Sequence, residues 1–194
     1  GVILSATDSL NWYAQIAGKS PAEITQALGT HLKAPSKVCF LPYLSGERTP
    51  HNDAKVRGAF IGLSHADQQQ DLTQAVLEGV GFAIRDNLAA LKAAGTSLER
   101  VTAVGGGSRS QYWLKVLATT LNLPIDLPAE GDFGAAFGAA RLALIAATQA
   151  EPLSVLTAPA VAQTIEPDFQ LTQAFSEAYA RYQQLYPAIK GASL

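Results

Sequence analysis

Three consecutive glycines between two apolar segments give this sequence its clearest chemical signal. Val101–Val104 has the composition of a short buried strand, Gly105–Ser110 follows at once, and a helix is expected over about 111–121. Glycine lets the backbone approach a ligand closely, and the start of a helix offers unpaired N–H groups and a positive dipole end to a phosphate. A nucleotide phosphate therefore suits this turn, although a tight strand-to-helix connection without any ligand fits the composition equally well.

Two common phosphate-binding fingerprints do not match the glycine turn. A dinucleotide-binding turn would carry glycine at the position of Ser110. A Walker A loop would carry Lys-Ser or Lys-Thr directly after its last glycine.

Composition excludes several other classes of function. With 14 Lys plus Arg, 16 Asp plus Glu and no basic block, the chain lacks the electrostatic footprint of a nucleic-acid or anionic-membrane protein. The single cysteine, Cys39, excludes an internal disulfide framework, and the three histidines show none of the spacings of a metal site. The apolar run over 134–147 is too short to span a membrane and contains Arg141, and residues 1–15 do not resemble a signal peptide. We therefore expect a cytoplasmic protein.

The chain has no Met and opens on Gly-Val-Ile-Leu, which resembles the tail of a strand, so we expect a fragment that folds as one domain. The pattern strand, glycine turn, helix occurs twice and predicts an α/β layered fold. The expected helices are 5–17, a short one from Pro21, a long one from an Asp67–Gln70 capping pair to Gly95, 111–121, 133–147 and 169–186; the expected strands are 38–41, 57–63, 101–104 and 125–127.

Several segments resemble the FGGY family of carbohydrate kinases. Gly58–Leu63, Asp71-Leu72 and Ala75–Glu78 fit the C-terminal signature of that family in residue type and spacing. Four further segments are most similar to its xylulokinase subfamily: Leu41–Asp53, Glu78–Gly81, Gly105–Trp113 and Gly131–Ala140. Together these segments extend the resemblance over about residues 1–147.

The resemblance implies an actin-like ATPase (ribonuclease H-like) C-terminal domain, a mixed sheet with flanking helices that lacks its first strands. Residues 1–194 would form the nucleotide-binding domain, with a core over about 1–147 and a linker and terminal helix over 148–194. The intact enzyme would transfer the γ-phosphate of ATP to a ketopentose, D-xylulose. Its general base, its sugar contacts and most Mg²⁺ ligands would lie in an absent N-terminal domain, so this chain alone would be inactive.

The resemblance also implies contacts for particular residues. Gly106 and Gly107 would lie against the α-phosphate and ribose, while Ser108 and Gln111 would lie near the adenosine. Thr7 and Asn11 would flank the same pocket from the first helix. Neither a catalytic residue nor a metal ligand is expected in this chain.

Other polar and aromatic candidates have structural interpretations. Glu47, Arg48 and Asp53 would order their loop against the missing domain or touch substrate, with the structural role favoured. We expect buried Glu78 to accept a structural hydrogen bond and Asp132 to cap a helix. We expect Trp12 and Trp113 to lie in the core, Cys39 to be an inert buried thiol, and His51 and His65 to be exposed to solvent.

Three alternatives remain open. Another sugar or polyol, such as ribulose, gluconate or glycerol, could be the substrate, or the chain could be a non-catalytic actin-like nucleotide-binding module. The third alternative is an α/β domain in which the glycines only form a tight turn and bind no ligand. An exposed sheet edge would also favour pairing with a second copy, so a homodimer is possible.

Overall fold

A computed structural model describes residues 1–129 and 134–191. The helices are α1 (Thr7–Ile16), α2 (Pro21–Gln26), α3 (Gln69–Ala93), the 3₁₀ turn η1 (Gly106–Arg109), α4 (Gln111–Leu121), α5 (Ala135–Thr148), α6 (Pro152–Val155) and α7 (Thr172–Lys190). The strands are β1 (Cys39–Leu41), β2 (Ala59–Ile61), β3 (Val101–Thr102), β4 (Ile125–Pro128) and β5 (Val161–Ile165). The α/β class predicted from the sequence is confirmed.

The strands form two small sheets. β1 and β2 pair antiparallel, and β4 lies between β3, its parallel partner, and β5, its antiparallel partner. The three-stranded sheet is therefore mixed, as expected. β5 was not predicted, because it lies in a segment that the sequence analysis took for a linker.

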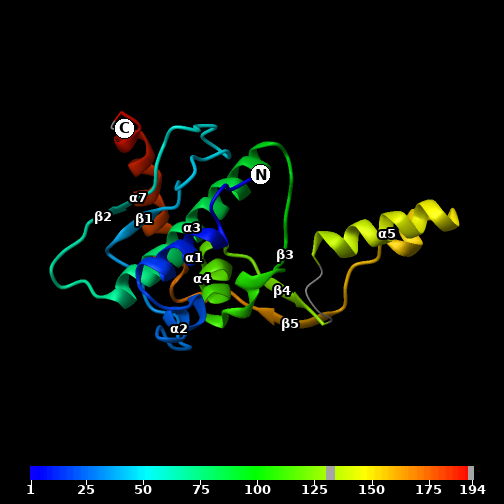
Figure 1. Cartoon of the computed structure of the whole chain (residues 1–194), viewed down its shortest axis with the longest axis horizontal. Coiled ribbons are helices and arrows are strands. Elements are labelled where there is room, and N and C mark those ends of the chain that lie inside the picture. Colours follow the sequence, from blue (N-terminus) through cyan, green and yellow to red (C-terminus); the bar gives the residue numbers. More distant parts are fainter. Residues whose placement is uncertain (130–133, 192–194) are drawn as a thin grey trace.

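Helix α3 is the central element, and α1, α4, α7 and β1 all pack against it (Figure 1). The sequence predicted one buried face, but the helix is buried on all sides from Thr73 to Ala83. Its capping pair is Gln68 and Asp71 rather than Asp67 and Gln70, because Asp67 instead accepts a hydrogen bond from the amide of Ser64 in the preceding turn. Gly95, with φ of +89°, follows the C-cap as predicted.

The C-terminal helix α7 completes the core. It begins at Thr172, three residues later than expected, and buries Phe175, Tyr179 and Tyr182 against α3, α4 and β1. The hydroxyl groups of Tyr182 and Tyr43 are hydrogen-bonded at 2.9 Å across a separation of 139 residues. The last helix therefore covers side chains from the first quarter of the chain.

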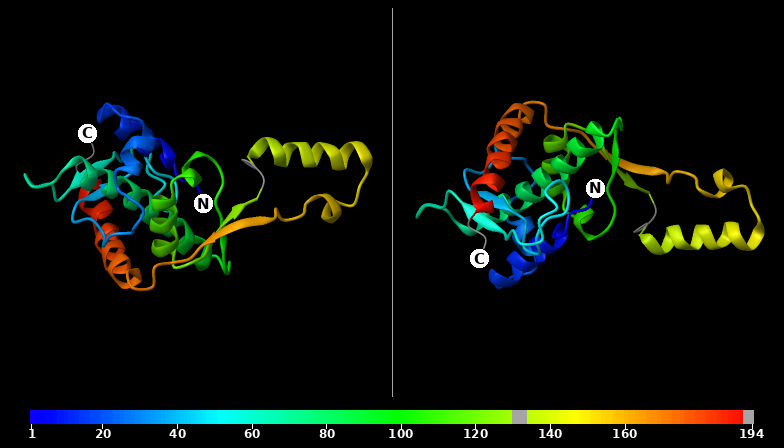
Figure 2. Two further views of the ribbon diagram at one scale, coloured as in Figure 1. Left: turned by 90° about the horizontal axis from the view of Figure 1, so that it is seen from below. Right: turned by 90° about the horizontal axis from the view of Figure 1, so that it is seen from above.

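Helices α5 and α6 form an arm that stands away from this body in every view (Figure 2). Nearly every residue of α5 is exposed, although the helix consists mainly of Ala, Gly, Leu and Phe. The predicted start of this helix at Phe133 and the predicted cap Asp132 lie outside the described residues. In the part that is described, no helix is long and apolar enough to cross a membrane.

Candidate functional site

A cavity of about 750 Å³ opens between α1, α2, η1 and the start of α4. Its volume is within the range of ordinary small-molecule sites. Residues from three separate stretches of the chain line it: Thr7, Leu10 and Asn11 from α1; Ser20–Ala22, Thr25, Gln26, Gly29 and Thr30 from α2 and its flanks; Gly106, Gly107 and Arg109–Trp113 from the glycine turn and α4. The fold thus joins α1 and α2 to a turn about 80 residues later.

The sequence-predicted contact residues meet at this cavity. Thr7, Asn11, Gly106, Gly107 and Gln111 all line it. Ser108 does not; it lines an adjoining cavity of about 270 Å³, which Thr7 and Gly107 also border. The structure therefore brings five of the six residues to one cavity, while their contacts with a nucleotide remain predictions.

The glycine turn differs in detail from the predicted strand-to-helix junction. β3 ends at Thr102, and η1 separates it from α4, whose N-cap is Ser110. Gly105 has φ of +86°, a left-handed conformation that favours glycine, and its carbonyl accepts hydrogen bonds from the amide and hydroxyl of Ser108 at 3.1 and 2.7 Å. The turn is consequently held by its own backbone and by Ser108, whose hydroxyl is engaged there rather than in the large cavity.

The two glycines that follow have different surroundings. A Cβ at Gly106 would meet nothing within 4 Å, whereas a Cβ at Gly107 would lie 3.1 Å from the Trp113 ring and 3.3 Å from Thr7 Oγ1. Gly107 therefore lets the turn lie against α1 and α4, and Gly106 leaves its part of the cavity open. The backbone at Gly106 therefore faces open space that a ligand can occupy.

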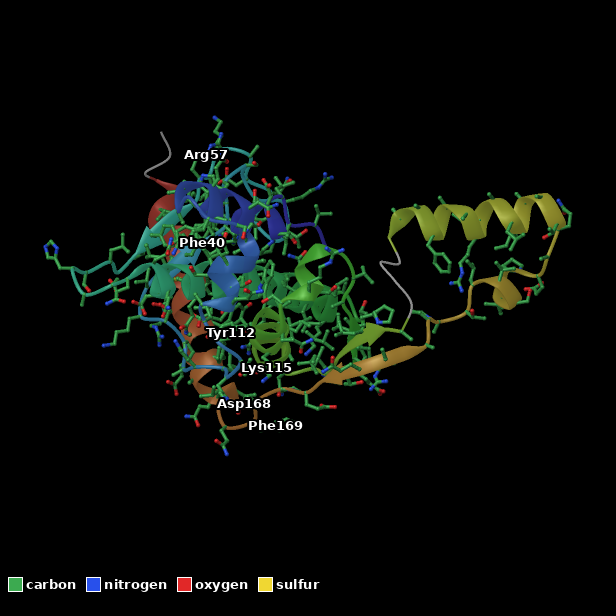
Figure 3. All side chains as sticks on the ribbon, turned by 60° about the horizontal axis from the view of Figure 1, so that its bottom comes forward. Phe40, Arg57, Tyr112, Lys115, Asp168 and Phe169 are labelled. Carbon is green, nitrogen blue, oxygen red and sulfur yellow. The ribbon has the colours of Figure 1, made fainter. Side chains whose placement is uncertain are left out.

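Buried aromatic residues hold the wall of the cavity in place. Trp113 is buried, and its Nε1–H donates to the carbonyl oxygen of Leu77 on α3 at 3.1 Å. The prediction that Trp113 anchors the core is confirmed, and partly buried Trp12 packs on the same core beside Phe40. Tyr112 lines the cavity, and the ammonium group of Lys115 on α4 donates to the carbonyl oxygen of Thr30 at 2.8 Å; both side chains are labelled in Figure 3.

The rim of the cavity that α2 forms, opposite the glycine turn, was not predicted from the sequence. α2 begins with a capping box in which the Ser20 hydroxyl accepts from the amide of Glu23, and the Glu23 carboxylate accepts from the amide of Ser20. Thr25, on the same helix, donates its hydroxyl proton to the Pro21 carbonyl at 2.8 Å. Ser20-Pro21 with Glu23 is a readable helix-start signal, but no local pattern indicates that this helix faces the glycine turn.

Among the described residues that line the cavity, Arg109 alone carries a charge. A carboxylate is absent from that lining, and within residues 1–129 and 134–191 no group of three His, Cys, Asp or Glu side chains is arranged to hold a metal ion. The cavity therefore suits an anionic ligand but supplies no evident Mg²⁺ ligand of its own.

The loop Pro42–Asp53 is ordered by contacts within the domain. Glu47 and Asp53 exchange backbone hydrogen bonds at 2.9 and 2.8 Å, and the Asp53 carboxylate accepts from the amides of Lys55 and Val56 and from the Tyr186 hydroxyl. The hydrogen bond from the Lys55 amide lowers the pKa of Asp53, and those from the Tyr186 hydroxyl and the Val56 amide add to this effect. Glu47 is buried, and its carboxylate accepts from the amide of Arg48 at 2.7 Å. These contacts order the loop within the described chain, and the expected ordering of the loop against the missing domain stays a prediction.

Two expectations about single side chains were wrong. His51 is not simply solvated: it is half-buried and stacked on Tyr186, with Nε2 3.2 Å from the Tyr43 hydroxyl. Cys39 is only partly buried, although burial still raises the pKa of its thiol to about 12, which keeps it protonated. His65 is exposed, as predicted.

Glu78 is the satisfied buried carboxylate that the sequence predicted. It accepts from the amide of Ser36 at 2.9 Å and from Gln74 Nε2 at 2.7 Å. Desolvation nevertheless raises the pKa of Glu78 to about 7, because the hydrogen bonds and Arg181 only partly offset the cost of burying its charge.

Comparisons with known proteins support one family. A sequence model of the C-terminal domain of the FGGY family of carbohydrate kinases matches residues 3–147. Xylulose kinases are similar in sequence: that of Escherichia coli K12 is 44% identical over 96% of this chain and 40% of its own length, and that of Klebsiella pneumoniae is 44% identical over 75% and 30%. The crystal structure of a xyloylose kinase from Brucella ovis is 62% identical, with a TM-score of 0.94 over 99% of this chain and 40% of that one. The matched regions thus span 30–40% of the length of these relatives.

Proposed function

Because this chain belongs to the FGGY family of carbohydrate kinases, which have an actin-like ATPase fold, we propose that it is the nucleotide-binding C-terminal domain of a D-xylulose kinase. The full-length protein would transfer the γ-phosphate of ATP to a hydroxyl group of the sugar. The observation that carries the proposal is the cavity between α1, α2 and the glycine turn, where five predicted contact residues meet.

Each part of the cavity has a role in this proposal. The backbone at Gly106 and Gly107 would lie against the α-phosphate and ribose, near the positive guanidinium of Arg109. Gln111 and Asn11 would approach the adenosine, and the hydroxyl of Thr7 would lie at the wall near Gly107. The part played by these residues in phosphoryl transfer is to position the nucleotide.

The general base, the sugar contacts and most Mg²⁺ ligands would belong to another domain of the full-length protein. Bound Mg²⁺ would neutralise phosphate charge during transfer. The described lining of the cavity contains no carboxylate that would accept the proton of a sugar hydroxyl. We therefore expect this chain to bind nucleotide without turning it over.

Gly106 offers the sharpest test of nucleotide binding. Since its surroundings are open, Gly106→Ala should preserve both fold and binding, whereas Gly106→Asp would place a carboxylate beside the expected phosphate. Calorimetric titration with ADP should show binding by wild type and Gly106→Ala and a loss of at least tenfold in Gly106→Asp. Adenosine, which has no phosphate, should bind all three proteins alike. Equal ADP affinity in Gly106→Asp would reject this placement of the nucleotide.

The substrate is tested separately in the full-length protein. ADP release with D-xylulose, ribulose, gluconate and glycerol should give the highest kcat/KM for D-xylulose. A higher value for another acceptor would replace the substrate and leave the nucleotide site intact. Nucleotide binding without transfer to any acceptor would instead favour the non-catalytic actin-like module.

A further inference from the structure

A hydrogen bond from Lys115 joins the two facing walls of the large cavity. One wall runs from Ser20 to Thr30 along α2 and its flanks, and the glycine turn and the start of α4 lie opposite. The ammonium group of Lys115 on α4 donates to the carbonyl oxygen of Thr30 at 2.8 Å (Figure 3). In the part of the chain that the structure describes, no other hydrogen bond joins residues 20–30 to α4. Lys115 is not among the described residues that line the cavity, so it contacts the wall from outside.

Helix α2 depends on its surroundings for its position. It has six residues, which is too short for a stable helix in water. Ile24 and Thr25 within it and Leu28 directly after it are buried, and they hold the helix against the body on one side. Gly29, with φ of +80°, then turns the chain into an irregular connection over 30–38. The end of the wall therefore has no regular structure to support it.

The far end of this connection is held by α3. The amide nitrogen Nε2 of Gln74 donates to the Ala34 carbonyl oxygen at 2.8 Å, and the backbone amide of Ser36 donates to the Glu78 carboxylate at 2.9 Å. Ala34 and Ser36 both lie beyond the last residue that lines the cavity. The connection thus has one anchor on α3, away from the cavity, and one on α4, where Lys115 holds the end that borders the cavity.

We propose that Lys115 is a positioning residue for the nucleotide, because it fixes the α2 wall of the cavity relative to α4. A hydrogen bond from an ammonium group to a carbonyl oxygen is charge-assisted and stronger than a neutral one. With the phosphate groups at the glycine turn, the nucleoside part of the ligand would extend across the cavity toward α2. Lys115 would therefore affect the nucleoside part without contacting it. This inference rests on the proposed function, which places a nucleotide in this cavity.

Lys115→Met tests the proposal by removing the ammonium group. Methionine keeps an unbranched apolar side chain, so the packing of α4 is preserved. Calorimetric titration should show that ADP and adenosine both bind about three- to tenfold more weakly. Lys115→Arg retains a charged donor and should recover most of the affinity. Exposed Lys33→Met removes the same charge from the connection after Thr30 and should bind both ligands as the wild type does.

A role of the charge alone would give a different pattern. The positive charge would favour the phosphate groups of ADP but not adenosine, and salt would screen it. Weaker binding of ADP with unchanged binding of adenosine would overturn the proposal, as would wild-type affinity for both ligands in Lys115→Met. In the full-length protein the variant should raise KM for ATP and leave kcat within about twofold, because the lost contact serves binding rather than transfer. A fall in kcat at unchanged KM would also overturn the proposal.

Hydrogen exchange without nucleotide tests the contact independently of the proposed function. The amides of Leu28 and Gly29 donate to carbonyl oxygens of α2 at 3.2 and 3.0 Å, and both should exchange at least threefold faster in Lys115→Met. The amide of Leu114, in a 3.0 Å hydrogen bond at the start of α4, should be unchanged and serves as internal control. Faster exchange in a protein that binds no nucleotide would reject the proposed function and still support the anchoring of α2. Unchanged exchange at Leu28 and Gly29 would overturn that anchoring.

Discussion

The imidazole ring of His51 lies parallel to the phenol ring of Tyr186, with 3.5 Å between the ring centroids and 9° between the planes. This stack joins the loop Pro42–Asp53 to the last helix, α7. The Tyr43 ring stands at 89° to the His51 ring, and the hydroxyl of Tyr186 donates to Asp53 at 3.0 Å. The loop is therefore fixed by residues more than 130 positions away.

His51 should make the stability of the domain depend on pH. Burial lowers the pKa of His51, an effect to which Lys190 adds and which Asp86 and Asp53 oppose. Between that lowered pKa and the ordinary value of about 6.5, the unfolded chain binds a proton that the folded chain does not. The contribution of His51 is present above pH 6.5 and is lost as pH falls through its folded pKa. Urea unfolding at several pH values should show this slope, His51→Phe should reduce it, and exposed His65→Phe should not.

Glu78 should produce the opposite dependence. Its pKa of about 7 in the folded chain lies above the usual carboxyl value of 4.5. Between these values the folded chain holds a proton that the unfolded chain releases, so stability falls as pH rises, by at most about 1.4 kcal/mol per pH unit. Glu78→Gln keeps an acceptor for Ser36 and should remove this loss. The same pH dependence in wild type and variant would contradict the assignment.

Gly79 should tolerate no side chain. A Cβ there would overlap the carbonyl oxygen of Phe40, because α3 crosses β1 backbone to backbone. Gly81, two residues later on the same helix, has only ordinary contacts of 3.5 Å or more. We expect Gly79→Ala to lower the free energy of unfolding by about 1–3 kcal/mol or more, measured by chemical denaturation. Gly81→Ala should be neutral or stabilising by up to about 1 kcal/mol; similar losses in both would refute the close approach.

Phe175 and Phe169 form a matched pair for the role of α7. Phe175 is completely buried, whereas Phe169 is 73% exposed and lies at the periphery in Figure 3. Phe175→Ala should cost about 3–5 kcal/mol and Phe169→Ala less than about 0.5 kcal/mol. Thermal and urea unfolding would both report the difference. A small cost at Phe175 would show that α7 is not part of the folded core.

The sequence predicted the elements whose signals are local. Glycine C-caps, capping residues and helical spacing located α1 to α4, because each depends on residues within one or two turns. β5 was missed because only its last residue, Ile165, is buried, and because the residues of β4 that pair with it lie 33 or more positions earlier in the chain. The all-round burial of α3 was missed because α7, which contacts Phe82 and Asp86 outside the apolar stripe, comes from a segment about 90 residues further along the chain.

In the candidate site, too, features with a local sequence signal were predicted and features set by distant packing were not. The glycine turn was recognised from its own residues, whereas Thr7 and Asn11 came from a family resemblance, and the fold places them around one cavity. Thr25 and Gln26 have no local feature that points to a ligand, since their position depends on how α2 packs beside α4. His51 was assigned to solvent because a histidine among polar loop residues gives no sign of a stacking partner on α7.

The hydrogen bond between Tyr43 and Tyr182 has a consequence for synthesis on the ribosome. The two hydroxyl groups are 139 residues apart in the chain, so Tyr43 emerges long before the helix that covers it is made. Closing so long a loop adds little free energy, because each doubling of length costs only about 0.6 kcal/mol. The long separation therefore affects when the core can form rather than how stable it is. The apolar surfaces of β1, α3 and the loop that begins at Pro42 stay exposed to solvent until α7 leaves the exit tunnel. The core of this domain is therefore completed only late in its synthesis.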